Sequence, residues 1–444
     1  MTRVLCVDFG STFTKAALVD ADDGTLVATA STPTTLGSDV LDGYRTLRAG
    51  LDGERVDEVL ACSSAGGGLR LAVVGYERAV TAEAGHRVGL SAGARVVHVA
   101  AGELTAADVA QLRAARPDVV LLVGGTDGGN GEVLRHNARR LGIARVPVPV
   151  VLAGNAAASE AAAHELLSRG RRVVVTDNVL PRIGVLEPAP ARAGIRNVFL
   201  RHVIGGKGLS RGPQLRRMVR AATPDVVLAG VEVLADGAPG SPGAGDVLVV
   251  DVGGATTDVY SVVSPGGEDA GLRKEVVATL WRSRTVEGDL GMRWNAPGVV
   301  SAARAEHLLG ADDEGLAAYA DQLAARPGHL PDVTDGDARL AGLAVTVAAR
   351  RHGRAPGPSS TPRPLREVGL VVGSGGVLRH HGDSVRRKVL SPLVSDHGGG
   401  WRVPERARLA VDDRYVLFAA GLLRDQAPDA AARLTHDAIR EVPR

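Results

Sequence analysis

The opening of the chain alternates apolar and polar residues in short runs that are separated by turn-forming residues. This pattern predicts three strands, at residues 3–9, 13–20 and 25–32, followed by a helix near residues 38–51. A fourth strand is predicted at residues 56–63. Strands joined by short turns pair antiparallel, whereas a strand reached through a helix is a crossover. The chain therefore opens with a predicted antiparallel meander and a crossover strand.

Residues 95–176 follow a different pattern, in which apolar runs of strand length alternate with longer segments of helical periodicity. Such alternation predicts parallel strands joined by right-handed helical crossovers. We interpret this part as an α/β segment inserted between two halves of another fold. The three predicted parts are residues 1–93, the α/β segment at residues 94–212, and residues 213–444.

The run DVLVVDVGGATTDVYSVV at residues 246–263 repeats the opening of the chain. The two stretches align without a gap at an offset of 243 residues, which places Asp8 on Asp251 and Gly10 on Gly253. In both copies the aspartate ends an apolar strand and a glycine turn follows. A single hairpin of this kind is ordinary turn chemistry, but its repetition in the same register predicts two turns that face each other across a cleft.

The two turns have the chemistry of a polyphosphate site. Glycine leaves backbone N–H groups open to a phosphate, and hydroxyl and ammonium groups add donors. Asp8 and Asp251 suit a Mg²⁺ ion held through water, because Mg²⁺ keeps several of its waters. Two ordinary β-hairpins remain the alternative, and the side chain of Lys15 points either into the cleft or to solvent. The candidate phosphate-binding residues are Gly10, Ser11, Thr12, Lys15, Gly253, Gly254, Thr256 and Thr257.

Composition and charge exclude several classes of protein. Hydrophobic residues make up 45% of the 444 residues but aromatic residues only 3%, which disfavours stacking platforms for single-stranded nucleic acid. The formal net charge of +2 disfavours attraction to nucleic acid or to an anionic membrane. Cys6 and Cys62 lie in apolar runs and form no disulfide framework, and no apolar run is long enough to span a membrane. We therefore expect a cytoplasmic protein with neither nucleic acid nor membrane as a partner.

Three motifs carry a resemblance to a known superfamily. The stretches at residues 8–12 and 251–258 resemble the two phosphate motifs of the actin, sugar kinase and Hsp70 ATPase superfamily, and VVGSGGVL at residues 371–378 resembles its adenosine motif. The resemblance implies a two-lobed α/β fold with duplicated ribonuclease H-like cores, and it implies ATP and Mg²⁺ as cofactors. The residues that it assigns to the nucleoside are Gly373, Gly375 and Gly376, and those that it assigns to catalysis are Asp8, Asp251 and Thr256.

Longer motifs narrow the resemblance to one family. The chain is similar to the MutL family associated with glutamate mutase from residue 1 to about residue 424, in TDNVLPRIGVLEPAPAR, RTVEGDLGMR, LLVGGTDGGN and VDDRYVLFAAGLL. Members of that family are thought to protect or reactivate adenosylcobalamin-dependent aminomutases. The resemblance therefore implies mutase subunits as partners and a chaperone-like reactivating factor that binds, and hydrolyses, ATP.

Other functions of the same fold stay open at this point. A small-molecule kinase would need a general base on the substrate side, which the sequence does not locate. An actin-like scaffold would bind nucleotide without significant turnover and form homo-oligomers. The first turn also resembles activators of 2-hydroxyacyl-CoA dehydratases, but those hold an iron–sulfur cluster through cysteines, and neither cysteine of this chain is suitably placed.

Two acidic loops are also open to two interpretations each. Asp127 and Asn130 follow a predicted parallel strand, so they either contact a partner protein or cobalamin or form a plain loop. Glu287 and Asp289 either border the nucleoside or cap a helix.

Overall fold

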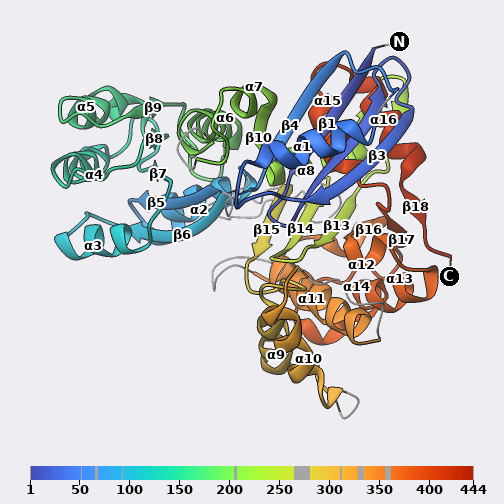
Figure 1. The fold of residues 1–444 in the computed structure, drawn as a ribbon. Coiled ribbons are helices and arrows are strands. Elements are labelled where there is room, and N and C mark those ends of the chain that lie inside the picture. The colour runs from blue at the N-terminus through green and yellow to red at the C-terminus, as the bar shows by residue number, and fades with distance from the viewer. Residues whose placement is uncertain are drawn as a thin grey trace.

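The computed structural model of the protein contains three large β-sheets, each in its own part of the molecule (Figure 1). Two sheets form the main body, one above the other in Figure 1, and the third lies to their left. We call the upper part lobe 1, the lower part lobe 2 and the part on the left the inserted segment, which spans residues 69–204. The structure describes residues 2–51, 53–65, 69–92, 94–204, 208–264, 281–310, 313–328, 335–355 and 362–443.

Lobe 1 is built from β1 (Arg3–Phe9), β2 (Phe13–Asp20), β3 (Leu26–Pro33), α1 (Val40–Ala49), β4 (Glu58–Ser63), α7 (Gln214–Met218) and β10 (Val219–Ala222). Its strand order is β3-β2-β1-β4-β10. The first three strands pair antiparallel, whereas β4 runs parallel to β1 and β10 parallel to β4. Helix α1 begins where predicted because the Asp39 side chain accepts a hydrogen bond from the Leu41 N–H.

Lobe 2 repeats this sheet. Its strand order is β15-β14-β13-β16-β17-β18, in which the first three strands again pair antiparallel while β16 and β17 run parallel to β13. The same order and directions in both lobes confirm the predicted two-lobed fold with duplicated ribonuclease H-like cores. The strands are β13 (Val247–Val252), β14 (Thr257–Val262), β15 (Arg282–Glu287), β16 (Leu370–Gly375), β17 (Arg408–Val411) and β18 (Arg440–Glu441).

Helices cover both faces of the lobe 2 sheet. Helices α8 and α15 lie on the face toward lobe 1, and α11 packs on the other face. The helices are α8 (Thr223–Asp236), α9 (Ala296–Ala305), α10 (Leu316–Ala325), α11 (Asp335–Gly353), α12 (Gly376–Arg379), α13 (Asp383–Leu390), α14 (Pro392–Ser395), α15 (Leu417–Leu423) and α16 (Pro428–Ala438). A short hairpin of β11 (Gly237–Ala238) and β12 (Ser241–Pro242) follows α8.

The inserted segment is an open parallel sheet with helices on both faces. Its strand order is β6-β5-β7-β8-β9, and every pair is parallel. Helices α3, α4 and α5 cover the outer face, while α2 and α6 pack between the sheet and lobe 1. The elements are β5 (Leu69–Gly75), η1 (Arg78–Ala82), α2 (Glu83–Ser91), β6 (Ala94–Ala101), α3 (Ala106–Ala114), β7 (Val119–Leu122), α4 (Glu132–Ile143), β8 (Val150–Leu152), α5 (Ala156–Leu167), β9 (Val173–Val175), α6 (Pro188–Val198) and η2 (Phe199–Val203).

Sheet pairing bears on the first predicted boundary. That boundary falls between residue 93, which lies outside the described residues, and Ala94 at the start of β6. Strand β5 precedes it but pairs with β6 and β7. We therefore propose that the inserted segment begins at β5. The sequence pattern predicted no strand at residues 69–75, so these residues were grouped with lobe 1.

Helices α8 and α15 cross between the two sheets at two glycines. A Cβ atom on Gly230 of α8 would lie 1.8 Å from the carbonyl oxygen of Leu417, and one on Gly421 of α15 would lie 2.0 Å from that of Val226. The two backbones are therefore in direct contact. One hydrophobic cluster joins these helices to apolar residues of both sheets, so the crossing is part of the core that the lobes share.

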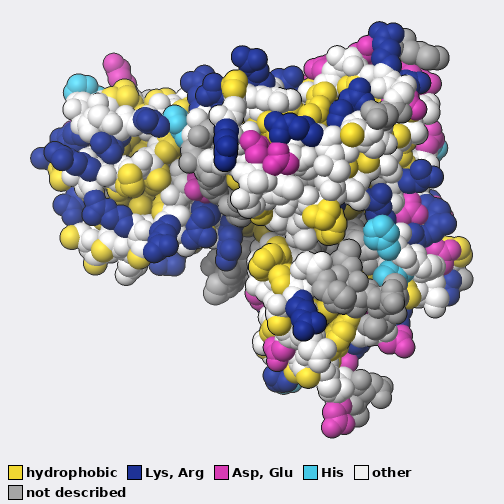
Figure 2. All heavy atoms as spheres, viewed as in Figure 1, with side chains coloured by type: hydrophobic (Ala, Val, Ile, Leu, Met, Phe, Trp, Pro, Cys, Tyr) yellow, Lys and Arg dark blue, Asp and Glu magenta, His cyan; other side chains and the backbone are white. Residues whose placement is uncertain are grey.

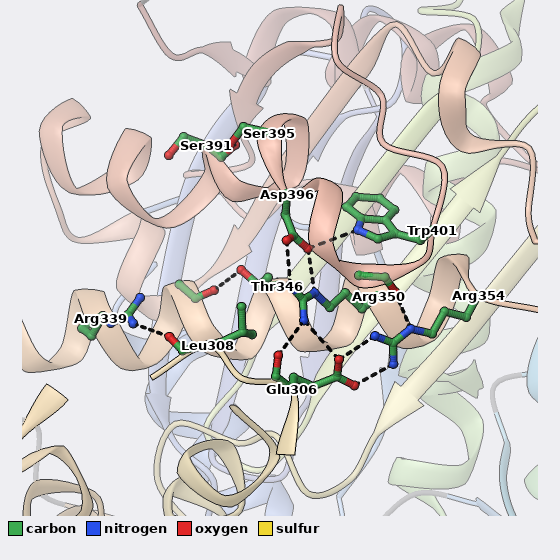
Figure 3. Close-up of polar contacts among 12 residues, drawn as sticks. Glu306, Leu308, Arg339, Thr346, Arg350, Arg354, Ser391, Ser395, Asp396 and Trp401 are labelled. Carbon is green, nitrogen blue, oxygen red and sulfur yellow. Dashed lines mark hydrogen bonds and ion pairs between the residues drawn. The ribbon is translucent and has the colours of Figure 1, made fainter. Parts of the chain in front are cut away.

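Helix α11 is fixed in lobe 2 by a buried arginine (Figure 3). Arg350 is 5% exposed and donates from Nε and Nη2 to the two carboxylate oxygens of Asp396, each at 2.7 Å. Its Nη1 donates to the Glu306 carboxylate at 3.1 Å, and Arg354 donates to the same carboxylate. Trp401 donates to Asp396 at 3.2 Å. Because each of these charges has a partner, the network tolerates burial and fixes α11 against its neighbours.

The glycine crossing predicts a large effect from a single carbon. We expect Gly230→Ala to lower the free energy of unfolding by about 3 kcal/mol or more, because the added Cβ cannot fit without moving a helix backbone. The matched control is Gly342→Ala in α11, where the nearest atom to an added Cβ is 3.9 Å away. That variant should be stabilised by about 0.5–1 kcal/mol, because alanine is the better helix former. Urea unfolding of both variants checks this, and equal effects would contradict it.

Candidate active site

The two glycine turns have the same hydrogen bond. The Gly10 N–H donates to the Phe13 carbonyl at 3.1 Å, and the Gly253 N–H donates to the Thr256 carbonyl at 2.9 Å. A Cβ atom on Gly10 would lie 2.5 Å from that carbonyl oxygen, and one on Gly253 would lie 2.9 Å from its counterpart. Glycine is therefore required in both turns for steric reasons. The repeat seen in the sequence is a repeat of turn geometry.

The two turns face each other between the lobes. A Cβ on Gly254 in the second turn would lie 3.3 Å from the Oγ1 atom of Thr12 in the first. This Oγ1 atom is buried and, in the part of the chain that the structure describes, has no hydrogen-bond partner. A buried hydroxyl without a partner is costly, and an oxygen of a bound phosphate would satisfy it. The residues therefore fit a phosphate group at this position.

Asp8 is held at the end of β1 by two donors from other elements. It is 2% exposed, and its Oδ1 accepts hydrogen bonds from Thr223 Oγ1 at 2.5 Å and from Cys62 Sγ at 3.6 Å. Burial raises the pKa of Asp8, while Lys15, directly opposite on β2, acts to lower it. Thr223 is the first residue of α8, so the helix that crosses to lobe 2 begins at this carboxylate.

Asp251 and Lys15 meet at a tyrosine. Tyr415 donates from its hydroxyl to the carboxylate of Asp251 at 3.2 and 3.4 Å, and the Lys15 ammonium lies 3.3 Å from the centre of the Tyr415 ring. Lys15 therefore points into the cleft. Burial raises the pKa of Asp251 and lowers the pKa of Lys15, and the attraction between these opposite charges opposes both shifts.

Asp412 caps the start of α15 beside this group. Its carboxylate oxygens accept hydrogen bonds from the Val416 N–H at 2.8 Å and the Leu417 N–H at 3.1 Å. Burial raises the pKa of Asp412 to about 6, against the lowering effect of these bonds, and the nearby Asp251 raises it further. Helices α8 and α15 thus both start at the carboxylates of the cleft.

The adenosine motif lies next to the second turn. Strand β16 pairs with β13 so that Ser374 is opposite Asp251 and Gly375 is opposite Val252. Gly375 has a φ of +113° and lies so close to β13 that an added Cβ would be 2.2 Å from the Val252 carbonyl oxygen. Gly373 faces Leu378, whereas a Cβ on Gly376 would meet nothing within 4 Å. Of the three glycines predicted to contact the nucleoside, Gly376 is the one whose backbone has free space beside it among the described residues.

Thr257 corrects one sequence-based expectation. Its hydroxyl was expected to donate to a phosphate, but Thr257 is fully buried at the start of β14 and donates instead to the Leu290 carbonyl at 2.5 Å. The hydroxyl proton is therefore already used. Ser11 and Thr256 lie in the turns themselves and are partly exposed, so their hydroxyl groups are accessible to a ligand.

The acidic loops also have partners within the fold. Asp127 Oδ1 accepts from Asn178 Nδ2 and from the Ala156 N–H, each at 2.9 Å, which fixes the glycine loop after β7. Glu287 and Asp289 both accept from Arg351 at 2.8 Å. These contacts account for the acidic residues as structural groups.

Sequence reasoning missed three residues of the site, Thr223, Asp412 and Tyr415. Thr223 is far from either turn in sequence and carries no motif. Asp412 and Tyr415 belong to VDDRYVLFAAGLL, which pointed to a family but not to a role. The sequence around Tyr415 gives no sign of its role. In the structure Tyr415 is marked by its φ of +60°, which a residue with a side chain rarely adopts.

Comparison with known proteins agrees with the motifs. A family model described as MutL protein matches residues 4–439. Protein MutL of Clostridium tetanomorphum is 34% identical over 458 residues, which cover 98% of each chain. The chain belongs to the MutL family. The family resemblance of the long motifs is thereby confirmed.

Solved structures give weaker likenesses to this chain. A nucleotide-free acetone carboxylase has a TM-score of 0.36 at 15% identity, over 95% of this chain and 70% of that one. Xylulose kinase from Lactobacillus acidophilus has a TM-score of 0.35 at 11% identity, over 99% and 93%. The ethanolamine utilization protein EutJ from Carboxydothermus hydrogenoformans has a TM-score of 0.30 at 10% identity, over 98% and 90%. The fold follows from the matching strand orders of the two lobes.

Two further findings concern metals and membranes. Among the described residues, no group of three or more His, Cys, Asp or Glu side chains is placed to hold a metal ion. Within the same residues, no helix has both the length and the apolar character needed to cross a membrane.

The raised pKa of Asp412 predicts how stability depends on pH. The folded value of about 6 exceeds the ordinary value of 3.8, so this group favours folding below pH 3.8 and its contribution is lost as the pH rises through 6. Relative to Asp412→Asn, which does not titrate, the wild type should lose about 3 kcal/mol of unfolding free energy between pH 4 and pH 7. Urea unfolding of both proteins at several pH values measures this. Parallel pH profiles would contradict it.

Proposed function

We propose that this protein binds Mg-ATP between its lobes, hydrolyses it, and acts as a reactivating factor for an adenosylcobalamin-dependent aminomutase such as glutamate mutase. The observation that supports nucleotide binding best is the pair of matching glycine turns, which face each other with Asp8, Asp251 and Lys15 between the lobes. Membership of the MutL family supports the choice of partner.

Each residue of the cleft has a proposed role. The backbone N–H groups of the turns, the Ser11 and Thr12 hydroxyls and the Lys15 ammonium bind the phosphates. Asp8 and Asp251 face a Mg²⁺ ion through its waters, and when bound this ion neutralises phosphate charge. Asp251 and Thr256 orient the attacking water. The open backbone at Gly376 contacts the nucleoside.

The two crossing helices supply a route from the cleft to the rest of the molecule. The start of α8 holds Asp8 through Thr223, and the loop before α15 holds Asp251 through Tyr415. A change in the separation of the two carboxylates must therefore move one helix against the other at Gly230 and Gly421. In this proposal, ATP and ADP favour different lobe arrangements, since a ligand shifts such an equilibrium only through its different affinity for the two states.

The inserted segment is the proposed site of partner binding. Residues 69–204 contain 17 arginines against 11 acidic residues, and Figure 2 shows Lys and Arg side chains gathered over this part, with hydrophobic side chains between them. Such a surface favours a protein partner with acidic groups. The segment also contacts both lobes, because it shares a hydrophobic cluster with lobe 1 and its helix α2 packs against β15 of lobe 2. It would therefore respond to lobe movement.

Turnover is the first test. We expect Mg²⁺-dependent ATP hydrolysis that a cobalamin-dependent aminomutase from the same source stimulates. Asp251→Asn should reduce it by about 100-fold or more, because the carboxylate that faces the metal and the water is lost. The control is Asp246→Asn, five residues earlier, where the side chain accepts a hydrogen bond from the backbone N–H of Ser264 at 2.8 Å. A steady-state phosphate-release assay measures this. Full activity of Asp251→Asn, or none in the wild type under any condition, would refute the mechanism.

Partner affinity is the second test. The tagged protein should retain the mutase to different extents with ADP and with a non-hydrolysable ATP analogue. Because nucleotide acts through the lobes, the difference should disappear in Asp251→Asn. A quantitative pull-down with purified components measures both amounts. Equal retention in the two nucleotide states would overturn the coupling, whatever the turnover.

A further inference from the structure

The contact between Lys15 and Tyr415 joins the two lobes at the cleft. Lys15 extends from β2 of lobe 1, and Tyr415 follows β17 of lobe 2. The separation of 3.3 Å between the ammonium nitrogen and the ring centre is well within the range of a cation–π interaction. In the described part of the chain, no carboxylate forms an ion pair with Lys15 at 4.0 Å or less. The aromatic ring is thus the direct partner of this ammonium group.

Tyr415 is itself held in an unusual conformation. Its φ of +60° lies in the left-handed region, where a non-glycine residue is strained. The next two residues donate their N–H groups to Asp412, and the ring packs on Phe418 with a centre-to-centre distance of 6.2 Å. A strained backbone conformation persists when many surrounding contacts hold it in place. Such residues are frequent at functional sites. The strain places the ring beneath Lys15 and the hydroxyl against Asp251.

Two carboxylates of the cleft, those of Asp8 and Asp251, also attract the ammonium group. Asp8 is opposite Lys15 on the neighbouring strand, and Asp251 is held by the same Tyr415. An ammonium group resting on a ring keeps its N–H donors available, whereas one paired to a carboxylate uses a donor and cancels the negative charge of its partner. The arrangement leaves one positive group for phosphate and two negative groups for other ligands.

We propose that Tyr415 is a positioning residue of the phosphate site, whose ring holds the Lys15 ammonium toward the phosphates and away from Asp8 and Asp251. The proposal rests on the proposed function, because it assumes that phosphate is bound in this cleft. It assigns the ring to Lys15 and the hydroxyl to Asp251, so the two parts of the side chain can be tested separately.

The chain is well suited to a direct test of the contact. It has only four lysines, Lys15, Lys207, Lys274 and Lys388, so protein labelled with ¹³C at lysine Cε gives few signals. The ring current of Tyr415 should shift the Lys15 signal upfield in the nucleotide-free protein, and Lys15→Gln assigns it. Tyr415→Phe should keep the shift, and Tyr415→Leu should abolish it. Lys388, which pairs with Asp335 at 3.3 Å, serves as the internal reference.

Binding of a non-hydrolysable ATP analogue with Mg²⁺, measured by titration calorimetry, tests the role. Tyr415→Leu should weaken binding about tenfold, because Lys15 loses its platform, whereas Tyr415→Phe should stay within about threefold of the wild type. The matched control Tyr319→Leu, in α10 of lobe 2, should bind as the wild type does. If Tyr415→Leu does not fold, pentafluorophenylalanine at position 415, compared with Tyr415→Phe, removes the attraction while keeping the shape. It should cause the same tenfold loss.

The outcomes separate this proposal from the proposed function. If the wild type does not bind the analogue, the proposed function fails and the role of Tyr415 fails with it. If the wild type binds but Tyr415→Leu binds equally well, or keeps the upfield lysine signal, only the positioning role is overturned. Loss of the signal together with weaker binding supports it when pentafluorophenylalanine causes the same loss of binding, since a purely structural role would be preserved by a ring of the same shape.

Discussion

The backbone contact between Gly230 and Gly421 is the constraint on which the cleft depends. Two helices can approach this closely only where neither has a side chain. One of them leads from lobe 1 to lobe 2 and starts at Thr223 against Asp8, and the other starts beside Asp412 and Tyr415. Their crossing therefore connects the hydrogen-bond partners of two carboxylates that belong to different sheets. A movement of α8 against α15 would therefore be felt at both sides of the cleft.

The cleft combines few charges under strong mutual influence. Three carboxylates, those of Asp8, Asp251 and Asp412, and the Lys15 ammonium are buried near one another at the cleft, where Coulomb interactions are stronger than in solution. Burial raises the pKa values of all three carboxylates and lowers the pKa of the ammonium, while the attraction between Lys15 and the carboxylates of Asp8 and Asp251 works against these shifts. Among the described residues, the Lys15 ammonium thus lies near these carboxylates without forming an ion pair with any of them. This is an arrangement suited to ligands that carry both phosphate and a cation.

The sequence predicted those features that repeat or alternate. The hairpin at Asp8 and its copy at Asp251 were visible because both copies keep the same spacing, and the strand order of both lobes bears this out. The α/β segment was visible from its alternation. The start that we propose for it, at β5, could not be predicted, because membership of a sheet is decided by pairing, and β5 leaves no mark of its partner in the sequence.

Side-chain direction was the harder part to predict. Thr257 matched the repeat but points into the core, where Leu290 takes its proton. Tyr415 matched no known spacing, and only the folded chain brings it under Lys15 from some 400 residues away. Periodicity gives the elements and their faces, whereas contacts between distant elements need the tertiary structure.

The position of the inserted segment has a consequence for how the molecule forms. Strand β10 completes the lobe 1 sheet by pairing with β4, but the whole inserted segment lies between these two strands in the chain. The inserted sheet is complete once β9 has been made, before β10 exists. Joining the ends of a long unstructured loop costs entropy that grows with its length, and a segment that is already folded shortens that loop. We therefore expect the lobe 1 sheet, whose first strands come first in the chain, to be completed late in folding, after the folded inserted segment has brought β4 and β10 close together.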